Sequence, residues 1–222
     1  MHFVKSTVGR KVLVAISGLL MVLFIIAHLV GNSVIYFPGA INAYAAHIHD
    51  LAPLLWTIRI VLLAAVAVHI IFGALLTLEN RTANPASYAV KNRLKANFAS
   101  ENMIWTGLLL LVFVAYHLLH FTFRVTPDVA PRLASLSAGS EFDVYAMVVG
   151  SFRHGAIAAI YVAAMFVLFL HLFHGIQAFF QTMGWNNDCT LPVISRIGRG
   201  AAILFMIGFS LIPLSILFHI LT

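Results

Sequence analysis

Charged side chains are scarce in this sequence. Asp, Glu, Lys and Arg together make up 9% of the 222 residues, whereas hydrophobic residues make up 62%. A soluble domain of this size needs a more polar surface, so this composition excludes one and predicts an integral membrane protein. Because almost no sequence remains for a soluble domain, the chain is restricted to an anchor, a channel, a carrier or an electron conduit.

Cysteine is nearly absent as well, since Cys189 stands alone. A single cysteine excludes an internal disulfide, a cysteine-ligated iron–sulfur cluster and the C-x-x-C-H attachment of c-type haem. We interpret Cys189 as an incidental thiol in a loop.

Long apolar runs are what the sequence has in abundance. About 20 residues cross the hydrocarbon core as a helix. Only helices and closed barrels satisfy the backbone in lipid, and runs as continuous as these exclude a barrel. The first run is too long for a removable signal peptide and lacks a small-residue cleavage site. We therefore predict an all-α, single membrane domain over residues 1–222, with five transmembrane helices at about 11–36, 54–78, 102–123, 155–182 and 200–221.

The distribution of Lys and Arg predicts the orientation. The N-terminal stretch, the second loop and the fourth loop hold nine of them: Lys5, Arg10, Lys11, Arg81, Lys91, Arg93, Lys95, Arg196 and Arg199. The first loop, 37–53, holds none, and the third, 124–154, holds three that acidic residues offset. The positive-inside rule then places the N-terminus in the cytoplasm and the C-terminus outside. This bias explains the net charge of +6 without nucleic acid, and the basic face suits a soluble partner or anionic lipid.

Four of the apolar runs carry histidine, which is costly inside a membrane and commonly marks function. With 1.5 Å of rise per residue, His28 and His117 lie ~24 and ~21 Å above the cytoplasmic ends of their helices. His69 and His171 lie ~22 and ~24 Å below the outer ends of theirs. In a core ~30 Å thick, these depths predict an outer pair, His28 with His117, and an inner pair, His69 with His171, ~15 Å apart.

Two such pairs favour two haems, each held by two imidazoles. Iron with both axial positions filled transfers electrons and does not activate oxygen. Tetrahedral zinc would need four ligands at one point, which two separate levels do not provide. Hydrogen bonds between helices are the simpler alternative explanation of these histidines. Gly73 and Gly175, each four residues after a histidine, would either admit a flat macrocycle or allow close helix packing.

Two of the runs contain a second histidine, so the ligands are ambiguous there. His120 follows His117 by three residues, and His174 follows His171 by three. Residues at this spacing share a helix face, and spacing alone does not choose between them.

The ordered set of motifs resembles a known family. The motifs are HLVGN at 28–32, HIIFG at 69–73, YHLLHFTFR at 116–124 and HLFHG at 171–175. They are similar to the cytochrome b membrane anchor of bacterial succinate dehydrogenases and fumarate reductases, in the five-helix, single-subunit, di-haem form. The resemblance covers about residues 10–185, and it departs from the family at Met183-Gly184-Trp185.

This resemblance implies the ligands and the partners. It selects His117 over His120 and His171 over His174, with two stacked b haems inside a bundle of the first four helices. A flavoprotein with FAD and an iron–sulfur subunit would dock on the cytoplasmic face of a bacterial inner membrane. Electrons from succinate would pass through the inner and then the outer haem to menaquinone or another quinone. The reverse direction would reduce fumarate, and a higher oligomer of the complex is possible.

Quinone reduction consumes protons, so titratable groups are expected near the quinone. His47, His49 and Asp50 in the first outer loop are candidates, although a solvated loop with capping residues explains them equally well. An inner site near Ser17, Arg10 and Lys11 is the alternative position.

Two other functions fit the same histidines. One is the di-haem cytochrome b of a hydrogenase or formate dehydrogenase. The other is a transporter that uses histidine to carry protons or metal.

Overall fold

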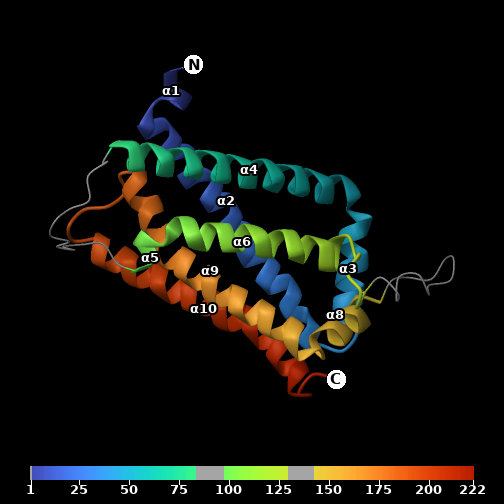
Figure 1. The fold of residues 1–222 in the computed structure, drawn as a ribbon. Coiled ribbons are helices and arrows are strands. Elements are labelled where there is room, and N and C mark those ends of the chain that lie inside the picture. The colour runs from blue at the N-terminus through green and yellow to red at the C-terminus, as the bar shows by residue number, and fades with distance from the viewer. Residues whose placement is uncertain (1, 84–97, 130–142) are drawn as a thin grey trace. The chain divides into compact units, whose positions relative to one another are not determined.

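The computed structural model describes residues 2–83, 98–129 and 143–222 (Figure 1). Within these ranges the chain forms helices and no strand, which confirms the all-α prediction. Five helical segments are long and apolar enough to cross a membrane. They are α2 (Thr7–Ser33) with the 3₁₀ turn η1 (Val34–Tyr36), α4 (Ala52–Ala83), α6 (Met103–His117) with the π-helical turn η2 (Leu118–Thr122), α9 (Gly155–Thr182) and α10 (Leu191–Leu217).

Large apolar side chains on these helices are exposed. The exposed fractions are 71% for Leu63, 66% for Val30 and 63% for Ile60. Apolar surface in water costs ~25 cal/mol per Å², so a surface of this kind is stable only against lipid or a partner protein.

Short helices occupy segments that the sequence analysis took as loops. They are α1 (His2–Lys5), α3 (Ala40–Asp50), α5 (Phe98–Glu101) and α8 (Val144–Phe152). Helix α8 lies in the third loop, 124–154. Asp143 caps it by accepting a hydrogen bond of 2.9 Å from the backbone N–H of Ala146, and Asn42 on α3 donates to the same carboxylate at 2.9 Å. Residues 130–142 of that loop, with the basic residues at 91–95, lie outside the described residues.

Helix α10 begins at Leu191 rather than near residue 200. The side-chain oxygen of Asn187 accepts hydrogen bonds from the backbone N–H groups of Cys189 (3.0 Å) and Thr190 (2.8 Å). Pro192 occupies the first turn, where a missing N–H costs no helical hydrogen bond. Local capping therefore extends this helix beyond its apolar run, and Cys189 is exposed just before it.

The chain divides into two compact units, which are described separately. Unit 1 comprises Met1–Ile25, Trp56–Gly107 and Leu170–Ala202. Unit 2 comprises Ile26–Leu55, Leu108–Phe169 and Ile203–Thr222. Each unit contains one of the two predicted histidine pairs, His69 with His171 in unit 1 and His28 with His117 in unit 2. The 15 Å separation between the pairs stays a prediction.

Candidate functional site

In unit 1, His69 on α4 and His171 on α9 face each other across a ring-to-ring distance of 6.3 Å. The Nδ1 atom of His69 lies 3.1 Å from the carbonyl oxygen of Val14 and 3.3 Å from Oγ of Ser17. A carbonyl oxygen only accepts hydrogen bonds, so Nδ1 carries the hydrogen. The Nε2 atom of His69 therefore keeps its lone pair and can bind a metal.

His171 has the same tautomer for a related reason. Its Nδ1 atom lies 3.0 Å from Oγ1 of Thr106 on α6. The Thr106 hydroxyl is within reach of the carbonyl oxygens of Asn102 (3.2 Å) and Met103 (3.1 Å). When it donates its single hydrogen to one of these carbonyls, its oxygen accepts from Nδ1 of His171, and Nε2 of His171 again keeps its lone pair.

A hydroxyl residue followed by glycine lies against each of these two histidines. A Cβ atom added at Gly18 would lie 3.3 Å from Cε1 of His69, and one added at Gly107 would lie 3.4 Å from Cε1 of His171. Ser17 and Thr106 are themselves buried. Thr106, Gly18 and Gly107 were not predicted from the sequence, although a Ser-Gly or Thr-Gly pair inside an apolar helix is a signal that points to such positions.

The two glycines that follow the histidines behave differently. A Cβ atom at Gly73 or Gly175 would meet no atom within 4 Å. Close helix packing at these positions, one of the two interpretations of the sequence, does not occur among the described residues. The space beside both backbones suits a flat ligand.

If His171 holds the haem expected from the sequence, replacing Thr106 by valine should weaken haem retention there. The change keeps the shape of the side chain and removes the oxygen that orients the imidazole. Loss of such an orienting partner commonly lowers metal affinity ~10–100-fold. Haem content during dilution or competition with an apo-haem acceptor measures the effect. Thr82→Val, where the hydroxyl bonds its own helix, is the control and should retain haem like the unmodified protein.

In unit 2, His28 on α2 and His117 at the end of α6 form the second pair. Their ring centres are 5.9 Å apart, and the ring planes are nearly perpendicular at 88°. His28 also lies 5.9 Å from the ring of Phe209 on α10. Both members of this pair were predicted from the sequence.

His120, the alternative ligand in the first doublet, has both ring nitrogens engaged. It is fully buried, with Nδ1 2.9 Å from the hydroxyl of Tyr161. Its Nε2 atom lies 2.8 Å from Oδ2 of Asp128 and 3.1 Å from Oγ of Ser151. In this arrangement neither nitrogen of His120 is open to a metal. Tyr161 and Ser151 were not predicted from the sequence, and Asp128 is one of the acidic residues of the third loop.

Asp128 lies outside the membrane-spanning segments and is ionised near neutral pH. Burial raises its pKa, but hydrogen bonds from Ser151 at 2.6 Å and from His120 outweigh burial and bring the pKa down to about 2. A carboxylate whose pKa is lowered by folding stabilises the protein above its unfolded pKa of ~3.9. That contribution is lost as the pH falls toward 2.

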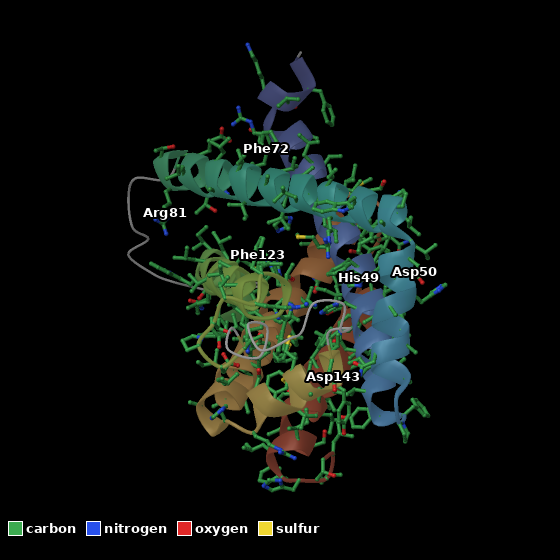
Figure 2. All side chains as sticks on the ribbon, turned by 90° about the vertical axis from the view of Figure 1, so that its right-hand side faces the viewer. His49, Asp50, Phe72, Arg81, Phe123 and Asp143 are labelled. Atoms are coloured by element: carbon green, nitrogen blue, oxygen red, sulfur yellow. The ribbon has the colours of Figure 1, made fainter. Side chains whose placement is uncertain are left out.

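The candidates for proton transfer lie elsewhere in unit 2. His47, His49 and Asp50 are exposed on the last turn of α3, where Figure 2 labels His49 and Asp50. Nδ1 of His49 bonds the carbonyl oxygen of Ala45 at 2.7 Å. None of the three takes part in the contacts of His117 or His120 given above. Their role near a quinone stays a prediction.

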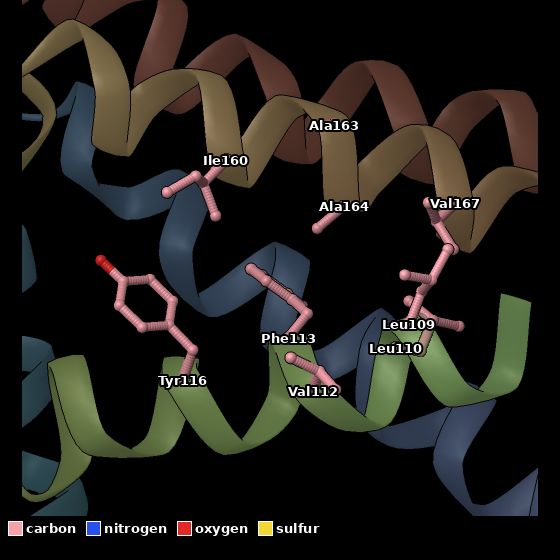
Figure 3. A pocket seen from close by; sticks show the side chains of 9 residues that line it. All are labelled: Leu109, Leu110, Val112, Phe113, Tyr116, Ile160, Ala163, Ala164 and Val167. Atoms are coloured by element: carbon pink, nitrogen blue, oxygen red, sulfur yellow. The ribbon is translucent and has the colours of Figure 1, made fainter.

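Unit 2 contains two cavities. An apolar cavity of about 380 Å³ separates α6 and α9, with Phe113 and Tyr116 on one side and Ile160, Ala164 and Val167 on the other (Figure 3). A second cavity, also of about 380 Å³, is lined by Tyr116, Thr126, Pro127, Asp128, His154 and Ile157. Tyr116 lines both cavities, and Asp128 and His154 line the second one.

Both histidine pairs fit a metal held between two imidazoles. With metal–imidazole bonds of about 2.0 Å, ligands on opposite sides of one ion have nitrogens ~4 Å apart and ring centres ~6 Å apart. The observed ring separations are 6.3 Å and 5.9 Å. Within the described residues, no group of three or more His, Cys, Asp or Glu side chains could hold a metal ion, so these residues offer pairs of imidazoles rather than the four protein ligands of a tetrahedral site.

A comparison with protein families gives a match over most of the chain. The family model described as succinate dehydrogenase/fumarate reductase transmembrane subunit matches residues 77–217. That segment is more than half of the chain and includes His117 and His171, whereas His28 and His69 lie before it. Comparisons with curated proteins and with solved structures found no match.

Proposed function

Because the chain belongs to the succinate dehydrogenase/fumarate reductase transmembrane subunit family, we propose that it transfers electrons between the iron–sulfur subunit of such a complex and membrane quinone. The family and the five apolar helices make it a multi-pass membrane protein. Catalysis on succinate or fumarate belongs to other subunits of the complex.

The observation that carries this proposal is the pairing of four intramembrane histidines at metal-binding distance. His69 and His171 would hold an inner b haem, and His28 and His117 an outer one. When bound, each haem supplies a one-electron carrier whose two axial positions are filled. The open space beside Gly73 and Gly175 supports this for the inner pair.

The protein's own groups prepare the inner pair. The carbonyl oxygen of Val14 and the hydroxyl of Thr106 hold hydrogens on the Nδ1 atoms of His69 and His171. Each Nε2 atom is then a lone-pair donor with a fixed ring orientation, which lowers the cost of binding a metal. Gly18 and Gly107 let the two rings lie against neighbouring helix backbones.

The family implies association with a flavoprotein and an iron–sulfur subunit. We place them on the basic cytoplasmic side predicted from the distribution of Lys and Arg, in a bacterial inner membrane. FAD and the iron–sulfur clusters then belong to those partners. The quinone is menaquinone or a related quinone, with His47, His49 and Asp50 as proton-donating candidates at the outer side.

The family match favours this function over the alternatives. A hydrogenase or formate dehydrogenase cytochrome b would also bind haem. The family to which this chain belongs is instead that of succinate dehydrogenase and fumarate reductase. A histidine-based transporter would bind no haem.

Purification in a mild detergent after expression with ample haem is expected to give two b haems per chain. The pyridine haemochrome spectrum and iron content measure this ratio. Co-purification with a flavoprotein that oxidises succinate supports the complex. A colourless protein that folds and inserts normally would contradict the proposal.

A further inference from the structure

A continuous hydrogen-bonded chain connects His117 to a carboxylate. Nδ1 of His117 lies 3.3 Å from the hydroxyl oxygen of Tyr161, which lies 2.9 Å from Nδ1 of His120. Nε2 of His120 then lies 2.8 Å from Oδ2 of Asp128. All four residues belong to unit 2, so the chain lies inside one compact body.

The donor and acceptor capacities give this chain a single direction. If His117 uses Nε2 for metal binding, its Nδ1 carries the hydrogen and donates to the Tyr161 oxygen. The Tyr161 hydroxyl then donates to Nδ1 of His120, whose other nitrogen donates to the Asp128 carboxylate. Ser151 donates to the same carboxylate oxygen at 2.6 Å and fixes its position. Every link has one donor and one acceptor, and the negative charge lies at the end remote from His117.

We propose that Asp128 is a positioning residue which, through His120 and Tyr161, makes His117 a more electron-rich ligand and lowers the reduction potential of the outer haem. This inference rests on the proposed function, because it requires a haem at His117. Hydrogen bonds in such a chain polarise one another, so a carboxylate at its end strengthens the donation from Nδ1 of His117. A more basic ligand stabilises the oxidised, more positive iron.

The inner pair offers a reference within the same molecule. The Nδ1 atoms of His69 and His171 donate to a backbone carbonyl and a threonine hydroxyl, which are neutral partners. No carboxylate is part of those contacts. Changes at Asp128 or Tyr161 should therefore move one haem couple and leave the other in place.

The test is a redox titration of the purified haem-loaded protein, followed by its visible and EPR spectra. Tyr161→Phe removes the hydroxyl that links His117 to His120. Asp128→Asn keeps the shape of the side chain at position 128 but removes its negative charge. Each should shift one of the two couples to a more positive potential. A shift of 59 mV corresponds to about a tenfold change in the ratio of reduced to oxidised haem for a one-electron couple. The outer couple is identified as the one missing in His28→Ala.

Two control variants make the result decisive. Asp128→Glu keeps the charge and should restore the potential toward that of the unmodified protein. Tyr145→Phe removes a hydroxyl in the same unit that bonds the carbonyl oxygen of Thr222 at 2.6 Å, and it should shift neither couple. If Asp128→Asn and Asp128→Glu shift the outer couple equally, packing rather than charge is responsible and the inference is wrong.

Failure of this inference differs from failure of the proposed function. Two bound haems whose potentials are unchanged in both Tyr161→Phe and Asp128→Asn overturn the inference alone. Absence of haem from the unmodified protein overturns the proposed function instead. If Tyr161→Phe loses the outer haem, the potential of Asp128→Asn decides the question.

Discussion

A His171→Ala variant is expected to retain one haem instead of two and to lose succinate-driven quinone reduction. The change removes the imidazole that Thr106 orients, together with its metal-binding Nε2 atom. His69 is then the one remaining ligand of the inner pair. The loss should exceed the ~10–100-fold weakening that follows removal of an orienting partner. Haem content per chain and quinone reduction with succinate as donor measure the two effects. Catalysis by the detached flavoprotein subunit with an artificial acceptor should stay normal.

The matched control for this variant is His174→Ala. His174 is half-buried three residues further along α9 and takes no part in the contacts that orient His69 and His171. The control should keep both haems and most of the quinone reduction. Loss of a haem in His174→Ala together with its retention in His171→Ala would reverse the assignment within this doublet.

A His117→Ala variant is expected to lose the outer haem and to keep the inner one. Because the inner pair lies in the other compact unit with its own orienting groups, succinate should still reduce the remaining haem. Quinone reduction at the outer side should fail nonetheless. Rapid-mixing spectroscopy with succinate separates these two readouts, since it records haem reduction directly.

His120→Gln is the control for His117→Ala. This substitution breaks the hydrogen-bonded connection between His117 and Asp128. It leaves the metal-binding nitrogens of His28 and His117 in place. Both haems should remain bound, with a changed potential at one of them. If His120→Gln removes the outer haem and His117→Ala does not, the ligand of the first doublet has been chosen wrongly.

The helices were predictable because lipid imposes a strong constraint on sequence. Runs of ~20 apolar residues have few structural alternatives in a membrane. Helix ends were less predictable, since they depend on single capping residues. Asn187 caps α10, which therefore begins at Leu191, before its most apolar stretch. Asp143 caps α8 within a segment whose composition is typical of a loop.

The histidines were predictable, but their surroundings were not. An imidazole inside an apolar run is conspicuous in sequence, whereas its partners are ordinary residues of other helices. Thr106 lies 65 residues before His171, and Tyr161 lies 41 residues after His120. Only the tertiary structure brings them together. The doublet could not be divided by spacing for the same reason, because the contacts of His120 come from α8, α9 and the segment after η2.

The π-helical turn directly after His117 determines the direction in which the chain leaves the helix. Its defining hydrogen bond joins the N–H of Phe123 to the carbonyl oxygen of Leu118 at 2.7 Å, and Arg124 follows with a left-handed φ of 58°. Such a turn holds one residue more than α-helical winding requires. We expect deletion of one residue there to restore α-helical winding and to change the direction in which the chain leaves the helix toward Asp128 by about 100°, the rotation per residue of an α-helix. The preceding helix and His117 should keep their place, so the carboxylate-bearing segment can be redirected separately from the histidine pair.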